Sequence, residues 1–348
     1  MKISVIFSAF ALCAAGASAQ TISGGPITGA IFDTATHSIR SIMGLPGAAY
    51  LGAVPASTWD LAMPSPDGKK ALAVRGGSLS LIADLSQPDT ATNIGGVIAA
   101  LDRVVWSADS SAAILYASRS SQLQRVTGLN GAPAIQPAVD LSGVGTISGW
   151  AISPDGRSVA YSIAASTAGA ANGSVYLLAD SAAPVKIGAI GDPGALAFAS
   201  DGASLFVFDH ASQKISRLET SSGAILDSFA ANVAGNAPAV APPSTAALRR
   251  LPVRRATQPD IRDLAATADG KQLLAVRSDA LCVYDLSRQT PDRCEALDVS
   301  PASIQTISPG VFVLNYPRTA ALPVWLWDGG AAAAYFVPPG RSATNASN

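Results

Sequence analysis

Aspartates recur at similar positions along this sequence, and carboxylates are suited to acid–base chemistry or to binding a divalent cation. Each lies in a short polar segment between two apolar runs, and four of the five are followed by glycine. In such a segment the aspartate accepts hydrogen bonds from nearby backbone, and the glycine adopts a positive φ at no steric cost. We therefore interpret them as turn residues of β-hairpins. They are Asp67, Asp109, Asp155, Asp201 and Asp269.

The two histidines, His37 and His210, are the next candidates for catalysis or metal binding. Each lies in a polar segment between predicted strands, and neither has a second ligand at the spacing of a known metal motif. The sequence also contains no nucleophile elbow, zinc-protease motif, P-loop or dinucleotide-binding fingerprint. It therefore predicts no catalytic or cofactor-binding residue, and which residues could bind a metal stays open. Whether the protein is an enzyme stays open, although the missing motifs argue against it.

Cys282 and Cys294 are expected to form a disulfide. They are the two cysteines that remain if an N-terminal export signal is removed, and paired cysteines are typical of exported proteins. If the segments around them are antiparallel strands with a turn centred on Arg288, the two sulfurs lie directly opposite each other. The alternative is two buried free thiols.

Four arginines form the one cluster of like charges in the sequence: Arg249, Arg250, Arg254 and Arg255. On an exposed loop they are candidates for binding an acidic protein surface or a polyanion. The alternative is a solvated loop without a partner.

Trp325 and Trp327 alternate along a predicted strand and therefore share one of its faces. Aromatic residues in such positions normally pack between sheets, so we expect these two to be part of the core. Stacking on a ligand is the alternative.

The elements that hold these residues are predicted to be strands. The stretch Trp150–Tyr161 shows the pattern: a short apolar run, the turn Ser153-Pro154-Asp155-Gly156 and a second run rich in β-formers. The intervals between successive turn aspartates are 42, 46, 46 and 68 residues. Repeats of roughly 40–50 residues with four strands each are typical of β-propeller blades. The sequence therefore predicts an all-β fold, a β-propeller of four-stranded antiparallel blades.

The Ser-Pro-Asp-Gly hairpins resemble those of WD40-like (PD40) β-propeller repeats, and Ile31-Phe32-Asp33-Thr34-Ala35-Thr36 is similar to the outer strand of YVTN-type propeller repeats. The resemblance covers nearly all of the chain after the export signal. It implies the fold and says little about function, because these families include binding scaffolds, lactonases and periplasmic accessory proteins. The chain departs from them in lacking a Tyr-Val-Thr-Asn tetrad and in losing the turn aspartate at Ser308-Pro309-Gly310.

Residues 1–19 have the features of a signal peptide: a lysine at position 2, a short apolar run and the small-residue motif Ala17-Ser18-Ala19. The apolar run is too short to span a bilayer, and no other stretch is long and apolar enough to do so. We therefore expect a mature chain that begins at Gln20 and is exported to the periplasm or the extracellular space.

Residues 20–337 are predicted to form a single β-propeller domain. Complete units start near residues 58, 103, 147, 193, 262 and 303, which gives six blades. The hairpin 29–44 reads as the outer half of a blade, either part of the sixth or the start of a seventh. We expect it to pair with the C-terminal strands, so that both chain ends close the ring of six or seven blades.

Two segments stand apart from the repeats. Residues 230–256, rich in alanine and proline, are expected to be a loop inserted between blades, and residues 338–348 a flexible tail.

Composition narrows the function without identifying it. Hydrophobic residues make up 49% and charged residues 14% of the chain, and the formal net charge of −1 gives no reason to expect a nucleic-acid partner. We expect an exported binding or scaffold module for a protein or a polyanionic surface. The rival hypothesis is a lactonase-like propeller hydrolase that holds a divalent cation such as Ca²⁺ through oxygen ligands at the channel mouth. No other cofactor is expected.

Overall fold

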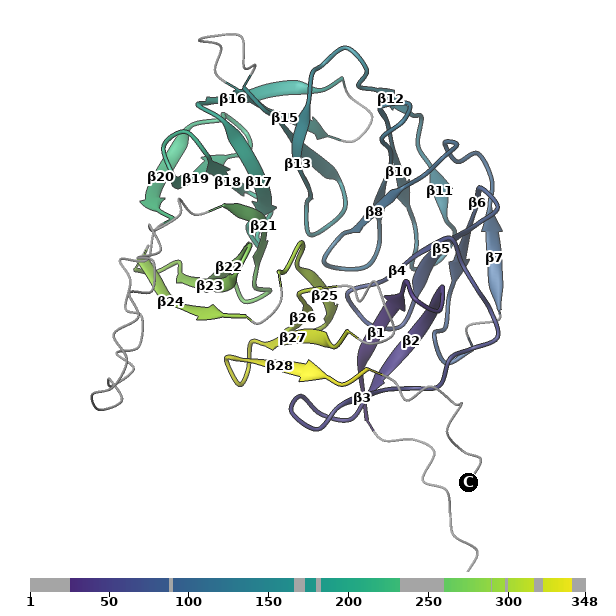
Figure 1. The fold of residues 1–348 in the computed structure, drawn as a ribbon. Coiled ribbons are helices and arrows are strands. Elements are labelled where there is room, and N and C mark those ends of the chain that lie inside the picture. Colours follow the sequence, from purple (N-terminus) through teal and green to yellow (C-terminus); the bar gives the residue numbers. More distant parts are fainter. Residues whose placement is uncertain are drawn as a thin grey trace, which may run out of the picture.

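The computed structural model describes residues 26–87, 90–165, 173–179, 183–231, 260–288, 290–297, 300–315 and 322–339. These residues form β-strands and no helix. The strands assemble into seven antiparallel sheets, and Figure 1 shows the sheets arranged as blades around a central axis. The protein is therefore a seven-bladed β-propeller, which confirms the predicted fold class.

We number the blades in chain order. Blade 1 contains β1 (Ile27–Asp33), β2 (Ser38–Met43) and β3 (Tyr50–Leu51). Blade 2 contains β4 (Leu61–Pro64), β5 (Ala71–Arg75), β6 (Ser78–Ile82) and β7 (Ala91–Ile94). Blade 3 contains β8 (Arg103–Trp106), β9 (Ala113–Ala117), β10 (Gln122–Thr127), β11 (Ala134–Ile135) and β12 (Val139–Asp140). Blade 4 contains β13 (Ile147–Ile152), β14 (Ser158–Ile163), β15 (Gly173–Ala179) and β16 (Val185–Ile190).

Three further blades complete the ring. Blade 5 contains β17 (Pro193–Phe198), β18 (Ser204–Asp209), β19 (Lys214–Glu219) and β20 (Ile225–Ala230). Blade 6 contains β21 (Ile261–Ala266), β22 (Gln272–Arg277), β23 (Ala280–Asp285) and β24 (Thr290–Ala296). Blade 7 contains β25 (Gln305–Ser308), β26 (Val311–Val313), β27 (Val324–Asp328) and β28 (Ala333–Val337).

Blades 2 to 7 share one plan. The first strand lies nearest the ring axis, and each later strand pairs with the one before it (Figure 1). In blade 3 the outermost strand is split, since β11 and β12 both pair with β10. The first strands begin at residues 61, 103, 147, 193, 261 and 305, close to the predicted unit starts.

Blade 1 has three strands among the described residues. The turn between β1 and β2 shows which strand positions of a blade they occupy. In this turn the Asp33 carboxylate accepts the backbone N–H two residues later, and His37 has a φ of 53°. The turn between the second and third strands of blade 5 repeats this with Asp209 and with Gln213 at a φ of 57°. β1 and β2 therefore correspond to second and third strands, and among the described residues blade 1 has no innermost strand.

The expected pairing of this N-terminal hairpin with the C-terminal strands is wrong. Among the described residues β1 hydrogen-bonds with β2 alone, and β28 pairs with β27 alone. The reason is that β25 to β28 already complete a four-stranded sheet of their own. The two chain ends still close the ring, because blade 1 and blade 7 bury a shared apolar cluster.

Every sheet buries both of its faces. Seven apolar clusters in the described residues fill the seven interfaces between neighbouring blades. In β18, Phe206 and Phe208 face blade 6, whereas Leu205 and Val207 face blade 4. Successive side chains of a strand point to opposite faces, so a strand that is covered on both faces reads as a continuous apolar run.

Several predictions lie outside the described residues. They are the signal peptide 1–19, all but the first two residues of the insertion 230–256, and the tail beyond residue 339. Within the described part of the chain, no helix has the length and apolarity needed to cross a membrane.

The turn after the first strand is built by a repeated set of hydrogen bonds. In blade 2, Ser65 Oγ donates to Asp67 Oδ1 at 2.5 Å, and the same oxygen accepts the Lys69 N–H at 3.0 Å. The hydroxyl–carboxylate bond recurs in Ser107–Asp109, Ser153–Asp155 and Thr267–Asp269. In blade 5 an alanine replaces the hydroxyl residue, and Asp201 keeps its backbone bond.

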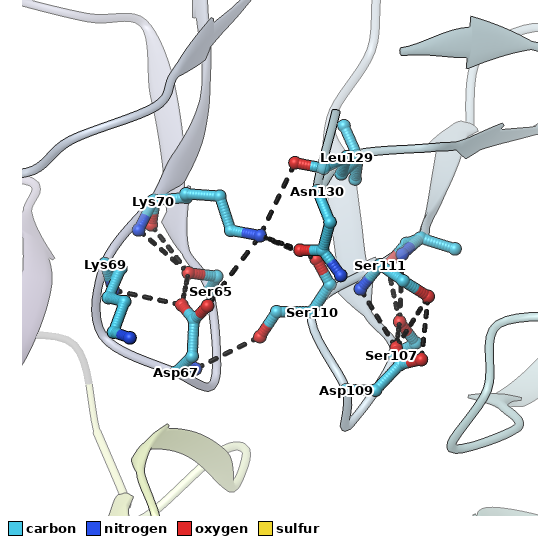
Figure 2. Close-up of polar contacts among 11 residues, drawn as sticks. Ser65, Asp67, Lys69, Lys70, Ser107, Asp109, Ser110, Ser111, Leu129 and Asn130 are labelled. Carbon is cyan, nitrogen blue, oxygen red and sulfur yellow. Dashed lines mark hydrogen bonds and ion pairs between the residues drawn. The ribbon is translucent and has the colours of Figure 1, made fainter. Parts of the chain in front are cut away.

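Lys70 joins blade 2 to blade 3, as Figure 2 shows. It is 9% exposed, and its ammonium donates to Ser110 O at 3.1 Å, to Leu129 O at 3.4 Å and to Asn130 Oδ1. The Asp67 carboxylate lies 3.7 Å away. A buried ammonium with three acceptors is satisfied, so it holds the turn of one blade against the next.

We predict that Lys70→Ala destabilises the protein by about 3 kcal/mol, because Ser110 O, Leu129 O and Asn130 Oδ1 lose their donor and the first two are buried. The matched control is Lys69→Ala, which removes an exposed ammonium and is expected to change the stability by less than about 0.5 kcal/mol. Urea unfolding measures both. Equal midpoints for the two variants would show that Lys70 does not connect the blades.

Candidate functional site

The turn aspartates accept hydrogen bonds within their own turns. The hydroxyl hydrogen bond from Ser153 lowers the pKa of Asp155, and the one from Thr267 lowers the pKa of Asp269. Each carboxylate is thus held as an ionised acceptor at the end of its own blade. Among the described residues no group of three or more His, Cys, Asp or Glu side chains comes close enough to hold a metal ion. The lactonase-like hypothesis therefore finds no carboxylate ligand set in this part of the chain.

The two histidines lie in different blades and contact nearby backbone or rings. His37 Nδ1 is 3.3 Å from Trp59 O. The ring of His210 packs so closely on Gly194 that a Cβ at that glycine would lie 2.4 Å from Nε2. The ring of Phe208 meets His210 edge-on at 4.7 Å. The structure does not bring the two histidines together.

The cysteines lie where the sequence predicts. Cys282 on β23 and Cys294 on β24 are direct cross-strand partners, and their Cα atoms are 4.0 Å apart with the sulfurs at bonding distance. Cys282 is fully buried. The pair therefore fixes the outermost strand of blade 6 to its neighbour.

The two tryptophans of β27 pack between blades 6 and 7. Trp327 is fully buried, with the guanidinium of Arg293 4.8 Å from its ring centre. Trp325 is partly buried, and its ring centre is 6.1 Å from that of Phe336. This arrangement agrees with the expected packing role. The basic cluster Arg249, Arg250, Arg254 and Arg255 lies outside the described residues.

A cavity of about 210 Å³ lies between blades 3 and 4. A comparison with the equivalent turn of blade 2 shows which side chain is too short to fill it. Ala112 of blade 3 stands at the position that Lys70 has in blade 2, three residues after the turn aspartate. Its short side chain leaves the interface unfilled. Arg125 on β10 instead donates to the carbonyl oxygens of Gly156 and Arg157. The cavity is thus a local variation of a repeated interface.

Three polar side chains on first strands of the ring form the strongest candidate site. Arg103 begins β8 in blade 3, Asp263 lies in β21 in blade 6, and Gln305 begins β25 in blade 7. Figure 1 shows these three strands next to the ring axis. We call the three residues the channel cluster.

Arg103 and Asp263 belong to blades that are not neighbours, since blades 4 and 5 lie between them along the ring. The positive charge of Arg103 lowers the pKa of Asp263 and is the smallest of the contributions to it. Arg103 is exposed, and among the described residues its guanidinium makes no hydrogen bond or ion pair.

Asp263 is held in position by backbone. Its Oδ2 accepts the Ile304 N–H and its Oδ1 accepts the Leu264 N–H, both at 2.9 Å. A β-bulge in β21 lies directly before Asp263, and bulges redirect the side chains that follow them. Burial raises the pKa of Asp263 to about 6, against the opposing effect of these two hydrogen bonds and of Arg103.

Gln305 crosses from blade 7 to blade 2. Its Nε2 donates to Pro64 O at 2.9 Å, and its Oε1 is buried without a hydrogen-bond partner among the described residues. Among the described residues blade 1 has no inner strand between the two, which permits this crossing. Cβ atoms placed on Gly29 or Gly68 would each lie 3.0 Å from Ile307 O, so blades 1, 2 and 7 approach closely at this point.

Sequence reasoning missed all three residues of the channel cluster. The one available signal was Arg262-Asp263, two charges inside a strand that is otherwise apolar; charged residues are seldom placed in a core without a partner. Arg103 and Gln305 carried no signal, because the surroundings of a first-strand residue depend on how the ring closes.

Comparison with known proteins supports the fold. No protein-family model matches the chain, and no curated protein matches it. A solved structure, of a functionally unknown protein from Desulfotomaculum acetoxidans DSM 771, superposes with a TM-score of 0.54 at 11% sequence identity. The match covers 90% of this chain and 99% of the other. At this identity the likeness shows a shared fold alone.

We predict that peptide mapping of unreduced protein finds Cys282 linked to Cys294. The cysteines are 12 residues apart, so chain-entropy arguments give a contribution of about 3 kcal/mol from the loop the bond closes. Cys294→Ala is then expected to lower the melting temperature under oxidising conditions and to change it little in reductant. Two reactive thiols in unreduced, denatured protein would contradict the bond.

We also predict that Asp263 makes the stability depend on pH. Its pKa of about 6 in the folded protein exceeds the ordinary 3.8, so folding favours the neutral form. The stabilisation is complete below about pH 4 and is lost as the pH rises through 6, by up to about 3 kcal/mol.

Asp263→Asn cannot ionise and is expected to remove this loss. Urea unfolding between about pH 4 and pH 7 measures it: the stability of the variant relative to wild type should increase with pH. A difference that stays constant over this range would mean that Asp263 titrates normally.

Proposed function

We propose that this protein is an exported β-propeller of the PD40/YVTN-like type that serves as a binding module for a protein or a polyanionic surface. The channel cluster is its central binding site. The observation that carries the proposal is the exposed Arg103 on β8, a strand next to the ring axis (Figure 1), whose guanidinium makes no hydrogen bond or ion pair among the described residues. An exposed guanidinium without an internal partner is available to an anionic group of a ligand.

The basic segment of the sequence supports the same preference. Four arginines lie between residues 249 and 255, in the connection between β20 of blade 5 and β21 of blade 6. β21 also carries Asp263, so this connection leads into the strand that holds part of the channel cluster. We propose that these arginines make a second contact with the same negatively charged partner.

Arg103→Ala is expected to abolish or strongly weaken partner capture. Mature protein is immobilised and exposed to an envelope extract, and the captured proteins are compared between variants. Loss of one charge contact should weaken the retained complex by at least about fivefold. Arg103 is exposed, so its removal should leave folding intact.

The matched control is Arg288→Ala. Arg288 is an exposed arginine in the turn between β23 and β24, the two outer strands of blade 6. The same proteins retained by wild type and by Arg103→Ala would show that the channel cluster does not bind the partner. Hydrolysis of a lactone panel that requires added Ca²⁺ would instead support the lactonase-like hypothesis.

A further inference from the structure

We infer that Asn130 is a site of covalent modification, where water converts the side-chain amide to a carboxylate with the help of Lys70. The site lies in the turn Gly128-Leu129-Asn130-Gly131, directly after β10 of blade 3. The modification needs neither a partner nor the residues at the ring axis, so it is independent of the proposed function.

The residue after Asn130 supplies the nucleophile. Gly131 has no side chain to shield its backbone nitrogen, and this nitrogen can attack Cγ of the preceding asparagine to close a cyclic imide. Both residues are exposed, and a Cβ placed on Gly131 would meet no atom within 4 Å. The turn therefore has room for the imide ring.

One backbone hydrogen bond opposes the attack. The Gly131 N–H donates to Gly128 O at 2.9 Å, so the turn has to open before the nitrogen reaches Cγ of Asn130. Gly128 and Gly131 are both exposed, and hydrogen bonds of exposed backbone open locally at a small cost in free energy. Opening of the turn therefore slows the reaction without preventing it.

Lys70 supplies electrostatic assistance. Figure 2 shows its ammonium directed at the Asn130 side chain, where it donates to Oδ1. Ser110 O and Leu129 O accept from the same ammonium and hold it in place. Negative charge develops on Asn130 Oδ1 during the attack, and a cation that is already in position stabilises this charge. Lys70 is buried, so water screens the interaction little.

The reaction balances with water as its one co-reactant. The Gly131 nitrogen forms a bond to Asn130 Cγ and gives up its proton, while the bond from Cγ to Nδ2 breaks and Nδ2 leaves with that proton as ammonia. Water then adds across one of the two C–N bonds of the imide. Cleavage at Cγ gives an aspartate and restores the Gly131 N–H, whereas cleavage at the main-chain carbonyl carbon gives an isoaspartyl linkage.

The aspartate product would place a carboxylate on the Lys70 ammonium. The Asp67 carboxylate is 3.7 Å from this ammonium, beyond hydrogen-bond distance. A carboxylate accepts a stronger hydrogen bond from an ammonium than a neutral amide does, so the product should hold blades 2 and 3 together more tightly. Asn130→Asp reproduces this product and should raise the midpoint of urea unfolding above that of wild type. A lower midpoint would overturn this consequence.

The test incubates the full mature protein in mildly alkaline buffer and follows its tryptic peptides by mass spectrometry. Asn130 is the one asparagine of the peptide 126–157, and fragmentation locates the change. Asn93 is the internal control, because it is exposed but is followed by Ile94, whose branched side chain shields the backbone nitrogen. Asn130 should react at least about tenfold faster than Asn93. Equal rates would overturn the inference.

Gly131→Ala tests the imide route. Gly131 does not adopt a positive φ and has open space around it, so the variant should fold like wild type. The added methyl group shields the nucleophile and should slow the modification of Asn130 at least about fivefold. An unchanged rate would show that the backbone nitrogen does not attack Cγ.

Lys70→Met tests the electrostatic assistance. It should slow the modification of Asn130 at least about tenfold and leave unchanged the rate at Asn172, which belongs to the second Asn-Gly pair of the sequence. If this variant does not fold, wild type is compared in buffer and in urea. Native protein should modify Asn130 faster than unfolded protein, because folding brings Lys70 to it. A rate in urea that equals or exceeds the native rate would overturn the role of Lys70.

Discussion

The structure depends on one constraint: each sheet is apolar on both faces and needs a neighbour on each side. A row of such sheets would leave two faces uncovered at its ends, and exposed apolar area of that size drives association. A ring leaves none. The seven apolar clusters, one at each interface, show how the ring meets this constraint, because each covers the facing sides of two neighbouring sheets. In the described part of the chain, ring closure comes from the cluster between blades 1 and 7, and neither blade takes a strand from the other.

The constraint also explains the turns. Packing fixes the faces of the sheets, but the turns at their ends must be held in register by polar contacts. The hydroxyl–carboxylate pair gives the turns of blades 2, 3, 4 and 6 the same hydrogen bonds, and further bonds connect one turn to the next. The backbone N–H of Asp67 donates to Ser110 Oγ, and that of Asp109 donates to Pro154 O. Lys70 adds a buried ammonium to the first of these contacts.

The structural features that could be predicted from the sequence are those that repeat along it. The turn aspartates and the strand starts recur at nearly fixed intervals, so the blades, and the pairing of Cys282 with Cys294 inside one of them, were accessible from local patterns. The hairpin 29–44 was recognised as the outer half of a blade, yet its partner was misjudged. The hairpin could have joined blade 7 only if that blade had fewer than four strands of its own. This depended on β25, and the turn after β25 lacks the aspartate found in the corresponding turns of blades 2 to 6.

The channel cluster was out of reach for a related reason. A repeated residue is occupied by the repeated structure, as the turn carboxylates show, so it has little capacity left for a ligand. Residues that differ from blade to blade have no such repeated structural role. At the ring axis such a residue can contact a blade far away in sequence, as Gln305 of blade 7 does when it donates to Pro64 O of blade 2. In a closed ring, polar side chains without a structural role are therefore found where the repeats differ and the blades converge.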